Sequence, residues 1–156
     1  MKKIDALNQV AEFHKTFKAP ILNSPTIPNQ QRCELRVSLL AEELKELQEA
    51  IAQNDLVEIA DALCDLQYVL SGAVLEFGLG DKFVDLFDEV QRSNMSKACQ
   101  SYEDAQETVN YYAQKDGTQA HIVAEGNLFL VYRSADNKVL KSIKYSPANL
   151  KEILAQ

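Results

Sequence analysis

The sequence predicts a mainly α-helical protein with a small antiparallel β element near its C-terminus. Two observations support this fold class. Apolar residues recur at helical spacing over most of the first hundred residues. Between residues 120 and 144 they alternate instead, in runs rich in Val, Ile, Phe and Tyr, with Gly126-Asn127 and Asp136-Asn137 as turn residues.

The helices are expected in the order 3–18, 31–53, 55–77, 81–96 and 101–114, with a short sixth over 147–155. Three prolines between residues 19 and 29 exclude a helix there. Asp55 is the expected N-cap of the third helix, and Gly78 follows the end of that helix. We expect two domains: a helical core over residues 1–100 and an appendage of a helix and a β-hairpin or meander over 101–156.

Composition narrows the function classes. The net charge of -7 disfavours binding to a phosphate backbone, so no nucleic-acid partner is expected. No apolar run reaches the roughly 20 residues that cross a bilayer, so no membrane partner is expected. The three cysteines are widely spaced and odd in number, which favours reduced thiols in a cytoplasmic protein.

The most informative segment runs from residue 42 to 65. It contains Glu42-Glu43-x-x-Glu46, then Glu58-x-x-Asp61, and then Asp65. Residues three or four apart share one face of a helix, so each of two successive helices presents a carboxylate cluster. Antiparallel packing of these helices would bring the two clusters together.

Three features separate this cluster from an ordinary charged surface. Glu43 falls inside the apolar arc of its helix, and Glu46 lies at the edge of that arc. The next helix is apolar almost all round, which predicts a buried helix whose acids line a sheltered strip. No Lys or Arg occurs between Glu46 and Asp81, so the acids lack local counterions. Hard cations such as Mg²⁺ or Mn²⁺ suit such oxygen ligands. The alternative is a solvated stripe on an acidic bundle.

At these residues the sequence resembles the MazG-like all-α NTP pyrophosphohydrolases, which include dimeric dUTPases and phosphoribosyl-ATP pyrophosphohydrolase. The signature E-x-x-E followed by E-x-x-D is matched by Glu43 to Glu46 and Glu58 to Asp61. The run Ser-Asn-Met-Ser-Lys at 93–97, the segment 138–141 and the pattern over 145–154 resemble the bacterial and phage branch. The resemblance implies a four-helix-bundle-type core and a homodimer or dimer of dimers. The resemblance is weaker over residues 101–135.

The resemblance also implies Mg²⁺-dependent hydrolysis of a nucleoside triphosphate, such as dUTP or a non-standard nucleotide, to the monophosphate and pyrophosphate. The expected metal ligands are Glu43, Glu46, Glu58 and Asp61, with Mn²⁺ as an alternative ion. Glu42 or Asp65 would accept the proton of the attacking water, and the sequence does not rank them. The expected substrate contacts are Tyr68, Asn94, Lys97, Lys138 and Lys141. Two alternatives stay open: a non-catalytic, metal-stabilised interaction module, and hydrolysis of phosphoribosyl-ATP.

Overall fold

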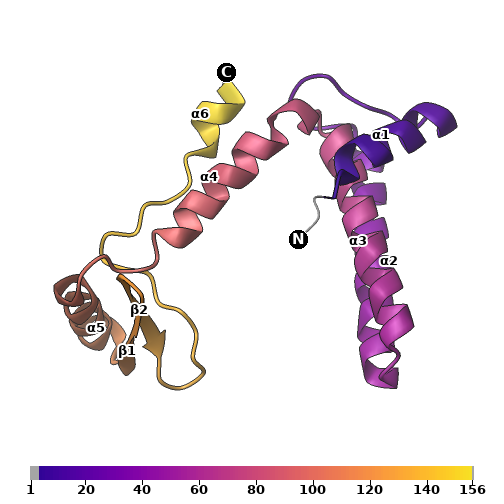
Figure 1. The fold of residues 1–156 in the computed structure, drawn as a ribbon. Coiled ribbons are helices and arrows are strands. Elements are labelled where there is room, and N and C mark those ends of the chain that lie inside the picture. Colours follow the sequence, from indigo (N-terminus) through magenta and orange to yellow (C-terminus); the bar gives the residue numbers. More distant parts are fainter. Residues whose placement is uncertain (1–3, 156) are drawn as a thin grey trace. The chain divides into compact units, whose positions relative to one another are not determined.

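A computed structural model describes residues 4–155 of the chain. It confirms the predicted fold class, because the described residues are mainly helical and carry one small antiparallel sheet near the C-terminus (Figure 1). The chain forms two compact units, which divide between Phe83 and Val84. The predicted domain division at residue 100 stays a prediction.

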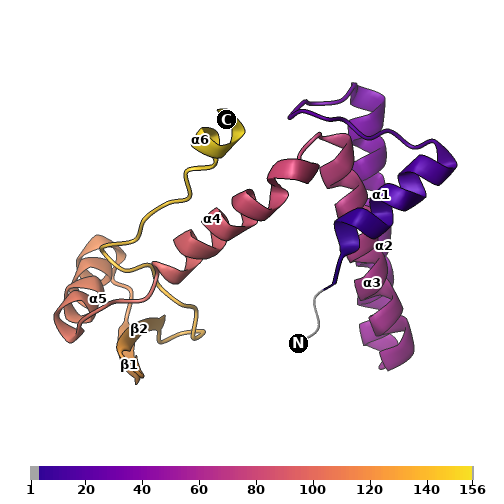
Figure 2. The same cartoon turned by 45° about the horizontal axis from the view of Figure 1, so that its top comes forward.

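The first unit is built on a pair of long helices. It contains α1 (Ala6–Phe17), α2 (Gln30–Gln53), α3 (Leu56–Glu76) and the short 3-10 turn η1 (Gly80–Lys82). The helices α2 and α3 lie side by side along their length, and α1 packs against α3 (Figures 1 and 2). Each long helix begins at a side-chain cap: Asn29 Oδ1 accepts from the backbone N–H of Arg32, and Asp55 caps α3 as predicted.

The turn between α2 and α3 is very short, so the helices must approach closely and run antiparallel. Asn54 ends α2 with a positive φ of 54°, a conformation that Asn tolerates better than most residues. The Asp55 N–H then donates to the carbonyl of Ala50 at 3.1 Å. Ala50 and Ala62 are both buried, and their small side chains allow close contact between the two helices.

At the other end of the hairpin, a buried ionic cluster joins all three helices. Glu76 of α3 is 1% exposed and accepts hydrogen bonds from Arg32 and Arg36 of α2. His14 of α1 lies 3.3 Å from Arg36 through Nε2 and 2.8 Å from the Pro20 carbonyl through Nδ1. A carbonyl only accepts, so Nδ1 carries the proton and Nε2 is the acceptor for Arg36.

Two glycines of the first unit are required by close approach. A Cβ at Gly72 would lie 2.7 Å from Nη1 of Arg36, so the buried ionic cluster depends on the missing side chain. Gly78 has a φ of +67° and would place a Cβ against the backbone carbonyl of Ser24. It therefore ends α3 and lets the loop before α2 pack against that end, where the Thr26 N–H donates to the Phe77 carbonyl.

The second unit contains α4 (Phe83–Met95), α5 (Tyr102–Asp116), β1 (Ala120–Glu125), β2 (Leu128–Arg133) and α6 (Leu150–Ala155). The two strands pair antiparallel, with Ala120 opposite Arg133 and Glu125 opposite Leu128. Of the two or three strands expected, two form, and Val139 adds an isolated bridge to Tyr132. The core of the unit consists of Cys99, Ala105, Val131 and Leu140.

The expected burial of the third helix is wrong for the single chain. Leu56, Val57 and Leu63 of α3 are 76%, 75% and 51% exposed. The reason is geometric: α1 and α2 cover only part of the circumference of α3. Cys33, Cys64 and Cys99 form no disulfide within the described residues. Within residues 4–155, no single helix is long and apolar enough to cross a membrane.

Candidate active site

The predicted acidic residues gather on the α2–α3 hairpin. Glu42, Glu43 and Glu46 occupy α2, while Glu58, Asp61 and Asp65 occupy α3. Both helices are fixed in register by the tight turn at residues 54–55, so the acidic faces are set by backbone packing. Across the two helices, the charges of Asp61 and Asp65 act on Glu43. The convergence of the whole set stays a prediction.

Glu43 is the central member of this group. It is half-buried, and its Oε2 atom is buried without a hydrogen-bond partner among the described residues. Burial raises the pKa of Glu43, and the charges of Glu46, Asp65, Glu42 and Asp61 raise that pKa further. Four carboxylates from two helices thus act on one partly desolvated carboxylate.

The remaining acids differ in exposure. Asp65 is half-buried, whereas Glu42, Glu46, Glu58 and Asp61 are exposed in the single chain. The expectation that the acids of α3 line a sheltered strip is therefore wrong for Glu58 and Asp61 in this chain. Glu58 lies in the first turn of α3. Its spacing of three residues still puts it on the same helix face as Asp61.

The chemistry of this group fits a hard divalent cation. All the candidate ligand atoms are carboxylate oxygens. One of them, Glu43 Oε2, is buried and accepts no hydrogen bond from the described residues. A buried, unpaired carboxylate is costly, and a cation would offset that cost. As the side chains stand, no three His, Cys, Asp or Glu residues between positions 4 and 155 converge closely enough to hold an ion by themselves. Side-chain rotation, water or phosphate oxygens would have to complete a coordination shell.

Tyr68 lies on α3, one turn beyond Asp65. Its ring meets that of Phe13 edge-on, with the centroids 5.6 Å apart. It also lines a mainly apolar cavity of about 430 Å³ between α1 and α3, together with Val10, Leu63 and Cys64. Tyr68 therefore lies beside an apolar cavity, and its contact with a substrate stays a prediction.

In the second unit, several predicted substrate contacts gather around Tyr145. The Lys97 ammonium donates to Asn94 Oδ1 at 2.8 Å, and the Lys141 ammonium lies 4.3 Å above the centre of the Tyr145 ring. The Ser142 N–H donates to the Lys97 carbonyl at 3.1 Å, which holds these two segments together. The hydrogen bond from Ser93, followed by the charges of Lys141 and Lys97, lowers the pKa of Tyr145.

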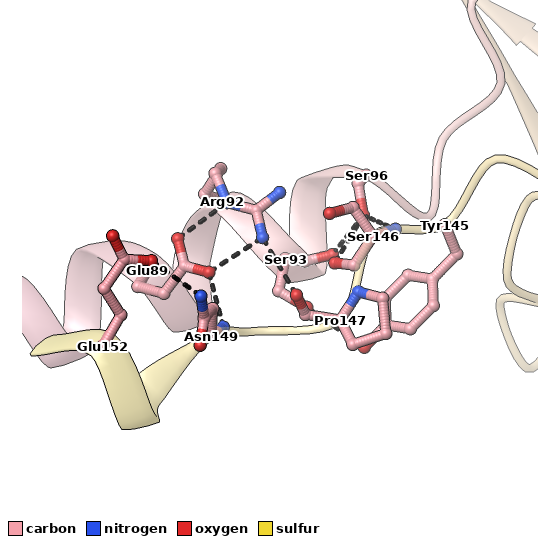
Figure 3. A network of polar contacts seen from close by, with 9 residues as sticks. All are labelled: Glu89, Arg92, Ser93, Ser96, Tyr145, Ser146, Pro147, Asn149 and Glu152. Carbon is pink, nitrogen blue, oxygen red and sulfur yellow. Dashed lines mark hydrogen bonds and ion pairs between the residues drawn. The ribbon is translucent and has the colours of Figure 1, made fainter.

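A network of polar contacts holds the C-terminal segment on α4 (Figure 3). Arg92 donates to both oxygens of Glu89, at 2.7 and 2.9 Å, and to the carbonyl of Pro147 at 3.1 Å. Glu89 also accepts from the Asn149 N–H at 2.7 Å. These hydrogen bonds lower the pKa of Glu89 to about 2. Arg92 is therefore held by Glu89 and the Pro147 carbonyl, whereas Lys141 contacts Tyr145.

Lys138 lies at a different place from the other cations. It follows the β2 strand and is exposed, its N–H donates to Asp136 Oδ1 at 3.2 Å, and its charge lowers the pKa of Asp136. Only Asn94, Lys97 and Lys141 of the predicted phosphate contacts therefore gather around Tyr145.

Sequence reasoning missed an aromatic and cationic group on α5. Lys115 lies 5.5 Å from the ring centre of Tyr111 and 5.8 Å from that of Tyr112. The spacing of four residues between Tyr111 and Lys115 was a visible signal. The connection to Lys141 and Tyr145 was not, because it depends on how the segment after β2 folds back onto α5.

The helical core is consistent with the MazG-like all-α pyrophosphohydrolases. Residues 10–94 match the family described as phosphoribosyl-ATP pyrophosphohydrolase, and the chain belongs to this family. The predicted resemblance is thereby confirmed. Membership implies a pyrophosphohydrolase and a nucleotide substrate.

The chain is also similar to the uncharacterized protein L479 of Acanthamoeba polyphaga mimivirus. The two are 23% identical in an alignment that covers 93% of this chain and 94% of that protein. The similarity therefore continues beyond residue 94 into the second unit.

Proposed function

We propose that this protein hydrolyses a nucleoside triphosphate to the monophosphate and pyrophosphate, using Mg²⁺ held by carboxylates of α2 and α3. The observation that carries the proposal is the buried Glu43 Oε2 atom, which lacks a donor among the described residues and is surrounded by acids. An ordinary surface cluster would leave each oxygen to water. A divalent cation would satisfy this atom and offset the repulsion among the acids.

The proposed ligands are Glu43, Glu46, Glu58 and Asp61, and Mn²⁺ is the alternative ion. The metal would neutralise phosphate charge and lower the pKa of an attacking water. Either Glu42 or Asp65 would take the proton from that water. A comparison of Glu42→Gln with Asp65→Asn ranks them: the base is the residue whose loss lowers kcat while the stabilisation by Mg²⁺ is kept.

The proposed contacts to the nucleotide are four polar side chains and one aromatic ring. The phosphate oxygens would be bound by Asn94, Lys97, Lys138 and Lys141. These local donors are needed because the net charge of -7 repels an anionic substrate. Tyr68 would contact the base or sugar through its ring. The base itself is not selected by these residues, and dUTP and non-standard nucleotides are the substrates to test first.

We also propose that the protein is a homodimer, or a dimer of dimers, in the cytoplasm. The exposed apolar residues of the α2–α3 hairpin support an oligomer, because a second copy would cover Leu56, Val57 and Leu63. Such packing would complete a four-helix bundle and shelter the exposed acids. Light scattering on the wild type and on Leu63→Glu tests this: the variant is expected to be a monomer.

The function is tested with a substrate panel. The wild type is incubated with Mg²⁺ and each deoxynucleoside and ribonucleoside triphosphate, dUTP included, and with phosphoribosyl-ATP, and released pyrophosphate is measured. Release from one or more triphosphates is the expected result. Release from phosphoribosyl-ATP alone would favour hydrolysis of phosphoribosyl-ATP, the reaction named in the description of the matched family.

A pair of variants on α2 separates ligand loss from charge loss. Glu46→Gln is expected to lower turnover by about 100-fold or more. Glu49→Gln is the control, because Glu49 lies about one turn further along α2 and forms an exposed ion pair with Lys45. This variant removes the same charge and is expected to keep normal turnover. Normal activity in Glu46→Gln would refute the ligand assignment. No release with any substrate, combined with melting that still depends on Mg²⁺, would favour the interaction module.

A further inference from the structure

The second unit contains a pocket of which the proposed function uses only Lys141. It has a volume of about 400 Å³ and lies between α5 and the segment 141–145. Its walls include three tyrosine rings and two ammonium groups, those of Tyr111, Tyr112, Lys115, Lys141 and Tyr145. None of the described residues that line it carries a carboxylate. In a chain of net charge -7, such a pocket is a local exception.

The pocket is fixed by the core of the unit. Thr108 of α5 is 0% exposed, and its hydroxyl accepts from the Ile143 N–H at 3.1 Å. One residue further on, the Lys144 ammonium pairs with Asp104 of α5 at 2.8 Å. These two contacts hold segment 141–145 along α5, so Lys141 and Tyr145 face the pocket from a defined backbone.

The rings and cations are arranged in a way that suits an anion with a flat aromatic part. The rings of Tyr111 and Tyr112 meet edge-on with centroids 5.2 Å apart, and Tyr111 is 48% exposed. Lys115 lies over both rings, and Lys141 lies over Tyr145. An exposed ring offers a stacking surface for any nucleobase, and the two ammonium groups offer positive charge for phosphate.

We infer that the pocket between α5 and segment 141–145 is a nucleotide-binding site, with Tyr111 contacting the base and Lys115 and Lys141 contacting the phosphates. The site shares Lys141 with the proposed function but requires neither the carboxylates of α2 and α3 nor a metal ion. It therefore assigns a role to α5, which lies outside the matched residues 10–94.

The test is calorimetric binding of the four deoxynucleoside triphosphates to the full chain in EDTA, where the proposed hydrolysis cannot proceed. Inorganic tripolyphosphate serves as the probe without a base. Saturable binding of at least one nucleotide is expected, and it should persist in the double variant Glu43→Gln/Glu46→Gln. The absence of saturable binding in EDTA would overturn the site and leave the proposed hydrolysis untouched.

Two variants and their controls locate the binding. Tyr111→Leu is expected to weaken nucleotide binding about tenfold and to leave tripolyphosphate binding unchanged. Its control is Tyr102→Leu, which removes an equally exposed tyrosine of α5 that pairs with Phe129 outside the pocket. Lys115→Ala should weaken the binding of both the nucleotide and tripolyphosphate, and this effect should become smaller as salt is added. Its control, Lys151→Ala on α6, should leave the binding of both unchanged.

Equal effects of each variant and its control would overturn the assignment. Melting temperatures of all four variants are measured alongside, so that a loss of binding is compared only between folded proteins. Loss of turnover in Glu46→Gln with nucleotide binding in EDTA retained would support both proposals. Loss of nucleotide binding in Tyr111→Leu bears on the pocket alone.

Discussion

The α2–α3 hairpin contains two glutamates that are withdrawn from water, and their surroundings are opposite. Glu76 is 1% exposed and accepts hydrogen bonds from Arg32 and Arg36. Glu43 is half-buried, has an unpartnered oxygen and is surrounded by carboxylates. Burial raises the pKa of Glu76, but the two arginines outweigh it and hold that pKa below its ordinary value.

The difference separates a structural carboxylate from one suited to function. The charge of Glu76 is balanced by the chain itself, so it contributes to folding. The charge of Glu43 is not balanced by any described residue, so the chain tolerates a cost that a cation would remove. The carboxylate of Glu76 is therefore paired within the described chain, whereas one oxygen of Glu43 is not.

Glu76→Gln is expected to have the largest effect on stability. The substitution keeps the shape of the side chain but leaves two guanidinium groups without their counterion, and such a loss typically costs about 3–5 kcal/mol. Urea unfolding measures the change, with Glu34→Gln on the exposed surface of α2 as the control. A loss below about 1 kcal/mol in the free energy of unfolding would contradict a stabilising role for the buried ionic cluster.

Glu43→Gln is expected to behave in the opposite way. Without metal, the variant should be at least as stable as the wild type, because it removes a charge that burial and four neighbouring acids disfavour. With Mg²⁺ at a hundredfold excess over its dissociation constant, the wild type should gain about 2.7 kcal/mol. The variant should gain far less. Thermal melting with Mg²⁺ and with EDTA checks both statements, and an equal gain in the two proteins would contradict the assignment.

The two glutamates should also give opposite pH dependences in EDTA. The pKa of Glu43 is raised above 4.5, so its contribution to stability is present below pH 4.5 and is lost as pH rises through the folded pKa. The pKa of Glu76 is lowered, so its contribution is present above pH 4.5 and is lost as pH falls through the folded pKa. The stability of Glu43→Gln relative to wild type should therefore increase as pH rises above 4.5. A difference that stays constant with pH would show that Glu43 is not perturbed.

Lys45→Ala should have the smallest effect. Lys45 pairs with Glu49 at 3.4 Å across one helical turn, but the two side chains are 75% and 57% exposed. Such pairs contribute about 0.5 kcal/mol or less. Urea unfolding at low and high salt measures the change, and a loss above about 1 kcal/mol would make exposed charge on α2 as important as buried charge.

Much of the local structure could be read from the sequence. The order of helices, the cap at Asp55 and the hairpin turn at Gly126 follow from spacing and turn residues, and the structure confirms them. The proximity of Asp61 and Asp65 to Glu43 was equally predictable, because helical spacing and a short turn between the helices leave little freedom. The inward position of Glu43 followed from its place in the apolar arc.

Other features depended on contacts between distant residues. Glu76 pairs with Arg32 and Arg36 across 44 and 40 positions of the sequence, and no local sequence pattern predicts such a pairing. The exposure of Leu56 and Leu63 was missed because periodicity reports how apolar a helix is, whereas burial depends on what covers it. The position of Lys141 over Tyr145 arises from backbone contacts with Lys97 and Thr108.

The sequence by itself determined which residues are helical and which carboxylates share a face, since both follow from a repeat of 3.6 residues per turn. Only the tertiary structure decided that Glu76 has a counterion and that Glu43 has none among the described residues. It also brought the tyrosines of α5 and the lysine of segment 141–145 to one pocket. The physical reason is that charge balance and pocket shape depend on the folded path of the whole chain, which local spacing does not encode.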